Sequence, residues 1–375
     1  MDPRIEKLSH ELITYSCALK PGEKVLIEYT GRECTDLVKA LIREAYAAKG
    51  LPFVQYEDES IKREILLGLD TEQAKLMSAL DQERMRNMDC YISVRGYDNI
   101  NELSDVPAFK IKKYDELYSV PVHDQIRIPK TRWAVLRYPN SSAAQLSGMS
   151  LEAFTDFYFD VCNLDYSKMS KAMEPLRDLM EKTDRVRIKA PGTDLSFSIK
   201  GIPAIPCDGK YNIPDGEVYT APVRDSVNGV ITYNTASTYN SHTFENISLR
   251  FENGKIMEAR ANDTEKINEI LDTDPQARYV GEFAIGLNPF VNSPMNDILF
   301  DEKINGSIHF TPGDSYEDAP NGNHSSIHWD LVLILRKEWG GGEIFFDDVL
   351  IQKDGKFVRD ELKGLNPENL KNIKS

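Results

Sequence analysis

In the first half of the chain, short apolar runs alternate with longer segments whose apolar residues recur every three to four positions. The short runs are typical of strands, and the longer spacing is typical of amphipathic helices. Their alternation predicts an α/β layer with parallel strand pairing. The segment 99–129 shows no clear period. The expected strands are 24–29, 53–56, 90–94 and 133–136, and the expected helices are 3–18, 34–49 (ended by Gly50), 76–86, 150–161 and 166–181.

The pattern changes near residue 183, after which short strand-like runs predominate. The dipeptides Asn253-Gly254 and Asp354-Gly355 are typical of tight hairpins, because these residues tolerate positive φ. A chain of 375 residues also exceeds the size at which one core keeps growing, about 250–300 residues. We therefore expect an α/β N-terminal domain, residues 1–183, and a β-rich, largely antiparallel α+β C-terminal domain, residues 184–375.

Composition and charge narrow the classes of function. The net charge of −15 argues against nucleic-acid binding, which needs a concentrated basic face. The five cysteines are scattered without CxxC spacing, so neither a disulfide framework nor a zinc knuckle is expected. No run approaches the roughly 18 apolar residues of a membrane helix, and the N-terminus lacks the apolar core of a signal peptide. We expect a cytoplasmic protein that does not contact membranes.

Two glutamates in the second half occupy positions that suit a ligand. Glu217 directly follows a Pro-Asp-Gly turn and precedes a short apolar run, so a rigid turn would hold its carboxylate, although a solvated glutamate is common after a turn and is the more frequent case. Glu282 lies in the apolar stretch 281–286. A carboxylate in such a stretch must be exposed, paired or bound to a metal, because burying it alone is costly.

Histidines and an aspartate follow further along the chain. His309 lies in a strand-like run, and Tyr316 follows it by seven residues. His328 and Asp330 are two positions apart, so on a strand both side chains would project from one face. Imidazole and carboxylate together suit a divalent ion; the alternative is a His–Asp hydrogen bond inside the core. His324 lies four residues before His328, but no Glu-x-x pattern lies between them.

Six segments occur in a fixed order along the second half: 193–201 (TDLSFSIKG), 212–223 (NIPDGEVYTAPV), 281–289 (GEFAIGLNP), 299–310 (LFDEKINGSIHF), 313–316 (GDSY) and 325–332 (SSIHWDLV). Together they resemble the aminopeptidase T / aminopeptidase S / PepS family of metallo-aminopeptidases. The resemblance extends over most of the chain. Segment 237–244 lacks the glycine expected there, a departure that would affect the substrate pocket rather than a proposed ligand.

The resemblance implies a metal-dependent aminopeptidase that removes N-terminal residues from small peptides, with a water activated by two divalent ions (zinc, cobalt or manganese) in the C-terminal domain. It also implies a homodimer whose sites face an enclosed chamber. Tyr316 would be catalytic, and Glu302 would be a further ligand or the general base. The implied metal ligands are Glu217, Glu282, His309, His328 and Asp330.

Two other functions remain open at this point. The same fold family is similar to ring-cleaving dioxygenases that hold one Fe(II), and a His/carboxylate set with open positions also suits iron. A metal-stabilised binding protein without catalysis is the third interpretation. The number and identity of the bound metals would distinguish the aminopeptidase from the dioxygenase.

Overall fold

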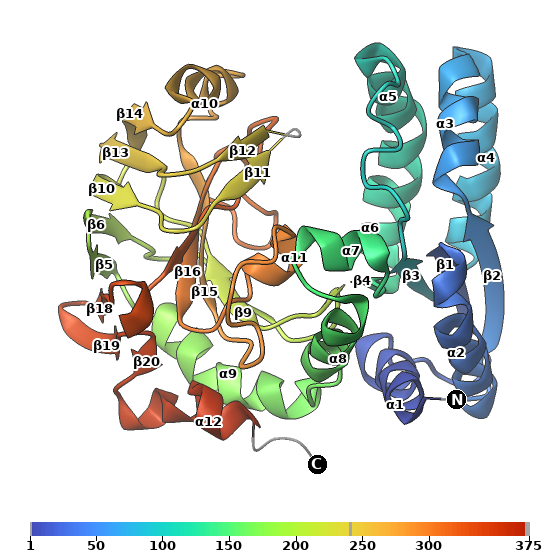
Figure 1. The fold of residues 1–375 in the computed structure, drawn as a ribbon, viewed down its shortest axis with the longest axis horizontal. Helices are drawn as coiled ribbons and strands as arrows, with labels where there is room; N and C mark the ends of the chain where they lie inside the picture. The colour runs from blue at the N-terminus through green and yellow to red at the C-terminus, as the bar shows by residue number, and fades with distance from the viewer. Residues whose placement is uncertain (1, 240–241, 372–375) are drawn as a thin grey trace. The chain divides into compact units, whose positions relative to one another are not determined.

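The computed structural model describes residues 2–239 and 242–371, which form two compact units (Figure 1). The first contains the residues up to Asn163 together with Gly209–Ile213, and the second contains Leu164–Asp208 and the residues from Pro214 onward. The contacts therefore divide the chain after Asn163 rather than near residue 183, and the segment Gly209–Ile213 belongs to the first unit. The domains 1–183 and 184–375 stay a prediction, because compactness alone does not show which parts fold independently.

The first unit is built on a parallel five-stranded sheet in the order β2-β1-β3-β4-β8. Val25, Leu26 and Ile27 on the second strand of this order are all buried, as expected of a strand covered on both faces. The predicted parallel α/β layer is confirmed. The strands are β1 (Lys24–Thr30), β2 (Leu51–Glu57), β3 (Cys90–Arg95), β4 (Arg132–Arg137) and β8 (Asn212–Ile213).

Helices connect these strands, and several begin at a side-chain cap. The Asp58 carboxylate accepts from the backbone N–H groups of Ser60 and Ile61, and Asp70 accepts from that of Gln73, which satisfies donors left open in a first turn. The helices are α1 (Pro3–Glu11), which continues as η1 (Leu12–Ser16), η2 (Arg32–Cys34), α2 (Thr35–Ala47), α3 (Glu59–Gly68), α4 (Thr71–Arg86), α5 (Ala108–Tyr114), which continues as the π-helical η3 (Asp115–Arg127), α6 (Ile128–Lys130), α7 (Ser141–Leu146) and α8 (Leu151–Cys162).

The second unit contains antiparallel sheets, as predicted: one of eight strands (β14-β13-β10-β6-β5-β18-β19-β20), one of five (β17-β16-β15-β9-β7) and the pair β11-β12. The ring of Phe197 lies 5.0 Å from those of Phe283 and Phe310, so the two larger sheets share an aromatic core. The predicted hairpin residues Asn253 and Asp354 both have positive φ.

The strands of the second unit are β5 (Arg185–Ala190), β6 (Thr193–Ser198), β7 (Ile205–Cys207), β9 (Glu217–Thr220), β10 (Asn228–Thr232), β11 (Ser237–Tyr239), β12 (His242–Phe244), β13 (Ser248–Glu252), β14 (Lys255–Arg260), β15 (Val280–Gly286), β16 (Ser307–Pro312), β17 (Val332–Ile334), β18 (Glu343–Phe346), β19 (Val349–Lys353) and β20 (Lys356–Phe357). Its helices are α9 (Tyr166–Met180), α10 (Thr264–Leu271), α11 (Ile298–Asp301), η4 (Lys337–Trp339), η5 (Asp360–Leu365) and α12 (Pro367–Leu370).

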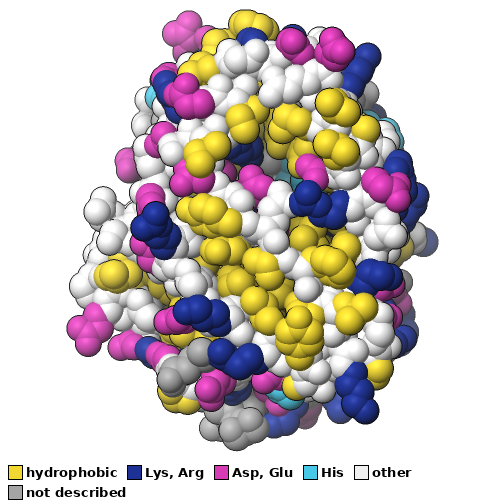
Figure 2. Space-filling view, turned by 90° about the vertical axis from the view of Figure 1, so that its right-hand side faces the viewer, with side chains coloured by type: hydrophobic (Ala, Val, Ile, Leu, Met, Phe, Trp, Pro, Cys, Tyr) yellow, Lys and Arg dark blue, Asp and Glu magenta, His cyan; other side chains and the backbone are white. Residues whose placement is uncertain are grey.

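Apolar side chains are exposed on the first unit. Strand β2 is an edge of its sheet, and Leu51, Phe53, Val54 and Tyr56 on it are each exposed by nearly half. Figure 2 shows apolar side chains spread over one face of the molecule. Unpaired edges with apolar residues are surfaces that other chains can cover. Within the described part of the chain, no helix is long and apolar enough to cross a bilayer.

Candidate metal centre

Three neighbouring strands of the five-stranded sheet bring three of the predicted ligands together. Glu217 begins β9, Glu282 lies in β15, and His309 lies in β16. Pairing of β15 with both β9 and β16 places these side chains in one region of the sheet. All three residues are at most 4% exposed, so each buried polar atom requires a partner or an ion.

Glu282 lies between two histidines. Its Oε1 is 3.1 Å from Nε2 of His309, and its Oε2 is 3.1 Å from Nε2 of His328. Each oxygen of this carboxylate therefore faces a different imidazole. A carboxylate in this position can contact two ions at once.

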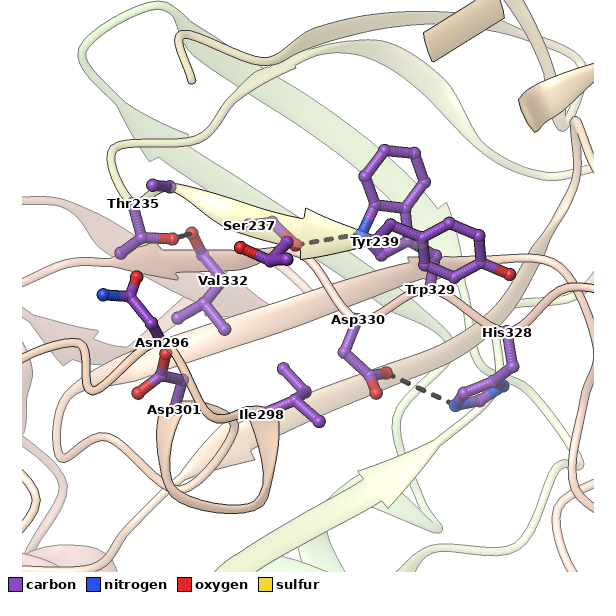
Figure 3. Close-up of a pocket in the computed structure, with 12 residues that line it drawn as sticks. Thr235, Ser237, Tyr239, Asn296, Ile298, Asp301, His328, Trp329, Asp330 and Val332 are labelled. Carbon is purple, nitrogen blue, oxygen red and sulfur yellow. Dashed lines mark hydrogen bonds and ion pairs between the residues drawn. The ribbon is translucent and has the colours of Figure 1, made fainter. Parts of the chain in front are cut away.

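His328 and Asp330 lie in the segment before β17, which begins only at Val332. Their side chains nevertheless point toward one another (Figure 3), with His328 Nε2 3.3 Å from Asp330 Oδ1. The Nδ1–H of His328 donates to the Asp314 carbonyl at 2.9 Å, which leaves Nε2 facing the carboxylates. Thr311 donates its hydroxyl to Asp330 at 2.7 Å. Both partners orient side chains that were predicted as ligands.

A lysine that the sequence reasoning missed lies inside this centre. The Nζ atom of Lys303 is 2.6 Å from Glu217 Oε1, 2.5 Å from Glu302 Oε1 and 3.7 Å from Asp215 Oδ1. The side chain of Lys303 is 1% exposed. Lysine is almost never buried without a charged partner. The one hint in the sequence is its position directly after Glu302, a candidate ligand.

The charged groups of the centre shift one another's pKa values. Burial raises the pKa of Glu217 to about 7, and Lys303 opposes that shift. Burial alone would lower the pKa of His309, but the carboxylates of Glu217 and Glu282 raise it to about 10. The pKa of Glu282 is lowered despite its burial, because both histidines donate to it. The protonated imidazoles thus supply positive charge next to the carboxylates, where a metal cation would otherwise supply it.

Tyr316 lies beside the centre, in the loop after β16. Its ring centroid is 4.7 Å from that of His328 and 5.5 Å from that of Tyr219. Tyr316 is 46% exposed; partial desolvation and then the nearby carboxylates, Glu282 first among them, raise its pKa. The phenol therefore stays protonated at neutral pH and can donate a hydrogen bond.

The donor set fits a divalent ion. Among the described residues, Glu217 Oε2 is a buried atom without a hydrogen-bond partner. The single positive charge of Lys303 balances only one of the negative charges in the cluster, so further cations would be stabilised there. Oxygen and imidazole donors suit zinc, manganese or cobalt. The groups whose ligand atoms lie within 4.8 Å of one another are Glu217/Glu282/His309, Glu282/His328/Asp330, Glu302/His309/Asp330 and Cys207/Asp215/Glu217.

A cavity of about 200 Å³ adjoins His328 and Asp330. Tyr239 and Trp329 form part of its wall, with ring centroids 4.9 Å apart, and Figure 3 shows Asp301 among its polar lining. Burial raises the pKa of Asp301 to about 7. Residues 237–239 of the segment that departs from the family pattern line this cavity, and residues 240–241 lie outside the described residues.

A buried cluster of carboxylates and imidazoles on an antiparallel sheet defines a metalloenzyme-type centre, and the comparison with known sequences agrees. The chain belongs to the thermophilic metalloprotease (M29) family, whose profile matches residues 1–357. It is accordingly a metallo-aminopeptidase, a hydrolase. The resemblance noted from the sequence is confirmed.

Characterised relatives align over most of the chain. Aminopeptidase T of Thermus thermophilus is 28% identical over 379 residues, covering 88% of this chain and 92% of the relative. Aminopeptidase PepS of Streptococcus thermophilus is 23% identical over 390 residues, covering 88% and 91%.

Two solved structures share the fold. Wild-type AmpT from Thermus thermophilus superposes with a TM-score of 0.79 at 22% identity, covering 95% of this chain and 99% of that one. A 2,5-dihydroxypyridine dioxygenase from Pseudomonas putida superposes with a TM-score of 0.62 at 13% identity, covering 96% and 99%. At these identities the likeness concerns the fold, so it does not transfer the dioxygenase activity.

Proposed function

We propose that this protein removes N-terminal residues from small peptides with a water activated by two divalent ions (zinc, cobalt or manganese). The observation that carries the proposal is the position of Glu282, whose two oxygens face two different histidines at 3.1 Å each. Two ions held a few ångströms apart require a carboxylate that can bridge them. Glu282 meets that requirement.

The ligands divide into two groups that share Glu282. One ion would be held on the His309 side with Glu217, and the other on the His328 side with Asp330. Lys303 occupies Oε1 of Glu217, which leaves Oε2 for a cation. Each group then supplies two carboxylates and one imidazole, a set that leaves room for water and substrate.

Divalent ions bound there supply Lewis-acid chemistry, polarising a carbonyl and lowering the pKa of a water. We assign the general base to Glu302, which takes the water's proton and passes it to the leaving amine. Its side chain is 15% exposed, against 5%, 4% and 12% for the carboxylates of Glu217, Glu282 and Asp330. Tyr316, protonated and beside His328, donates to the oxyanion of the substrate.

The cavity beside His328 is proposed to receive the side chain of the peptide's N-terminal residue. Its aromatic wall of Tyr239 and Trp329 suits apolar side chains. Asp301 has its pKa raised to about 7 by burial and so is partly protonated at neutral pH. The cavity therefore favours uncharged N-terminal residues over acidic ones.

A homodimer and a cytoplasmic location remain predictions. The exposed apolar edge of β2 (Leu51, Phe53, Val54 and Tyr56) supports self-association, because an uncovered apolar edge favours pairing with another chain.

Metal reconstitution tests the proposal. Chelator-stripped protein is given Co, Zn, Mn or Fe(II), and hydrolysis of a panel of aminoacyl-p-nitroanilides is followed together with the metal content per chain. Turnover restored by Co, Zn or Mn near two ions per chain is expected. One tightly held Fe(II) without peptide hydrolysis would instead favour the dioxygenase. Tight metal without any turnover would favour a binding protein.

Two variants test how the ligands are shared. Glu282→Gln removes the carboxylate common to both groups, so both ions should be lost. In the proposed division around Glu282, Asp330 belongs to the His328 group, so Asp330→Asn should leave about one ion per chain. Glu269→Gln, on the exposed side of α10, serves as the control and should keep wild-type metal content. Equal metal loss in the first two variants would contradict the assignment of Glu282 as the shared ligand.

A further inference from the structure

The first unit has a polar pocket at the place where open α/β sheets bind ligands. Strand β1 is followed through α2 by β2 on one side, whereas β3 and β4 lie on the other. The chain therefore diverges at the carboxyl ends of β1 and β3, and ligands of such sheets bind in the crevice that this creates. A cavity of about 230 Å³ lies at these ends. Its floor carries Glu28 and Thr30 from β1 and Ser93 and Arg95 from β3.

This switch-point pocket also holds Arg127, a cation that has no carboxylate within 4 Å in the described part of the chain. Arg127 is stacked 4.5 Å from the ring centroid of Trp133, and its Nε–H donates to His123 Nδ1 at 3.2 Å. Its Nη1 is buried without a hydrogen-bond partner among the described residues. Burial, and then the charges of Arg127, Arg95 and Lys62, lower the pKa of His123 to about 4. An anionic group would give the Arg127 guanidinium the hydrogen-bond partner that it lacks.

The same pocket also carries carboxylates. Glu28, Glu57 and Glu59 line it, and Tyr91 donates its hydroxyl to Glu28 at 2.8 Å. Burial, with a contribution from Glu57, raises the pKa of Glu28. Lys62 lies 3.9 Å from Glu59. In the described part of the chain, neither arginine of the pocket lies within 4 Å of a carboxylate, so Arg95 and Arg127 are not ion-paired with these glutamates.

We propose that the switch-point pocket binds a small zwitterion, a free α-amino acid. Its carboxylate would be received by Arg127 and Arg95, and its ammonium group by Glu28 and Glu57. A small cavity that carries both glutamates and arginines without an ion pair matches the two termini of one amino acid better than it matches a phosphate or a simple amine. The proposal rests on the proposed function only for the origin of the ligand: an aminopeptidase releases free amino acids, so the ligand would be the enzyme's own product.

Calorimetric titration of the full-length, chelator-stripped protein tests this pocket. Glycine, alanine and leucine are the probes, and propionate, propylamine and inorganic phosphate each lack part of the zwitterion. Amino acids should bind more tightly than each of the three by about tenfold or more, the effect of a lost charge-assisted hydrogen bond. Stripping removes ions that could otherwise bind amino acids at the metal centre.

Variants locate the binding. Arg127→Met and Glu28→Gln should each weaken amino-acid binding by about tenfold or more, and Arg86→Met, outside the pocket on α4, should not. Because Arg127 packs on Trp133, circular dichroism checks its fold, and Glu28→Gln tests the site if Arg127→Met unfolds. No binding, equal binding of phosphate or propionate, or binding unaffected by Glu28→Gln would overturn the proposal. Peptide hydrolysis by the metal-loaded protein, measured separately, reports on the proposed function alone.

Discussion

Single side chains in the metal centre have roles that substitution can separate. Tyr316→Phe removes the phenolic donor while every proposed ligand remains. We expect kcat to fall by about 10²-fold, the effect of losing one oxyanion donor, with metal content unchanged. Steady-state kinetics with metal analysis checks this, and Tyr211→Phe at an exposed tyrosine is the control. Unchanged turnover would remove Tyr316 from the mechanism.

Lys303 is expected to matter most when metal is absent. Lys303→Met leaves Glu217 and Glu302 buried without their ammonium partner, which typically destabilises a protein by about 3–5 kcal/mol. Bound divalent ions would compensate for that loss. Thermal unfolding of chelator-treated Lys303→Met should therefore show a much larger drop in Tm than unfolding of the metal-loaded variant. The exposed Lys200→Met is the control, and an equal drop in both preparations would show a purely structural lysine.

At the scale of elements, the position of β15 depends on a close contact beside Glu282. A Cβ atom at Gly281 would lie 1.8 Å from the carbonyl oxygen of Asp314, so Gly281→Ala must displace the strand or the loop. We expect a loss of about 1–3 kcal/mol of stability, as for other overpacked sites, together with reduced metal content. Gly68→Ala at the end of α3, where nothing lies within 4 Å, should be neutral. Retained metal content in Gly281→Ala would contradict the expectation.

Helices and strands were predictable where the spacing of apolar residues along the chain was regular. The parallel strands of the first half and the hairpins at Asn253 and Asp354 follow from local pattern. Strand β15 was not predicted, because its two glycines and Glu282 interrupt the apolar signal of a run that is wholly buried. The end of α2 also differs from expectation. Lys49 adopts the left-handed conformation with φ 61°, whereas Gly50 is needed because a Cβ there would lie 2.5 Å from the Leu19 side chain.

The candidate ligands were predictable as residue types, but their arrangement was not. The ordered segments pointed to Glu217, Glu282 and His309, yet only pairing of β9, β15 and β16 shows that they converge. Lys303 was missed because a lysine next to a glutamate usually lies in solvent. Its burial becomes evident only from contacts made across the sheet.

At the scale of the whole molecule, stability should depend on metal more strongly as pH rises. The pKa of His309 is raised from about 6.5 in an unfolded chain to about 10. Its ion pairs therefore stabilise chelator-treated protein fully below about pH 6.5, and this contribution is lost as pH rises toward 10. Metal binding requires the neutral imidazole and strengthens with pH. The difference in Tm between metal-loaded and chelator-treated protein should widen from pH 6 to about 9.

Differential scanning fluorimetry at several pH values checks this dependence. His10→Asn at an exposed histidine outside the centre is the control, and its difference in Tm should widen with pH as in the wild-type protein. A difference that stays constant or narrows in the wild-type protein would contradict the expectation.

The burial of Lys303 among carboxylates has a consequence for how the enzyme matures. A centre made only of acidic ligands would repel itself while the nascent chain collapses, and would need ions at that moment. Here an ammonium group encoded by the chain itself, assisted by two protonated imidazoles, already holds the carboxylates in place. Folding can thus finish before metallation, and the ion that the enzyme carries would then be set by what is available after synthesis rather than during it.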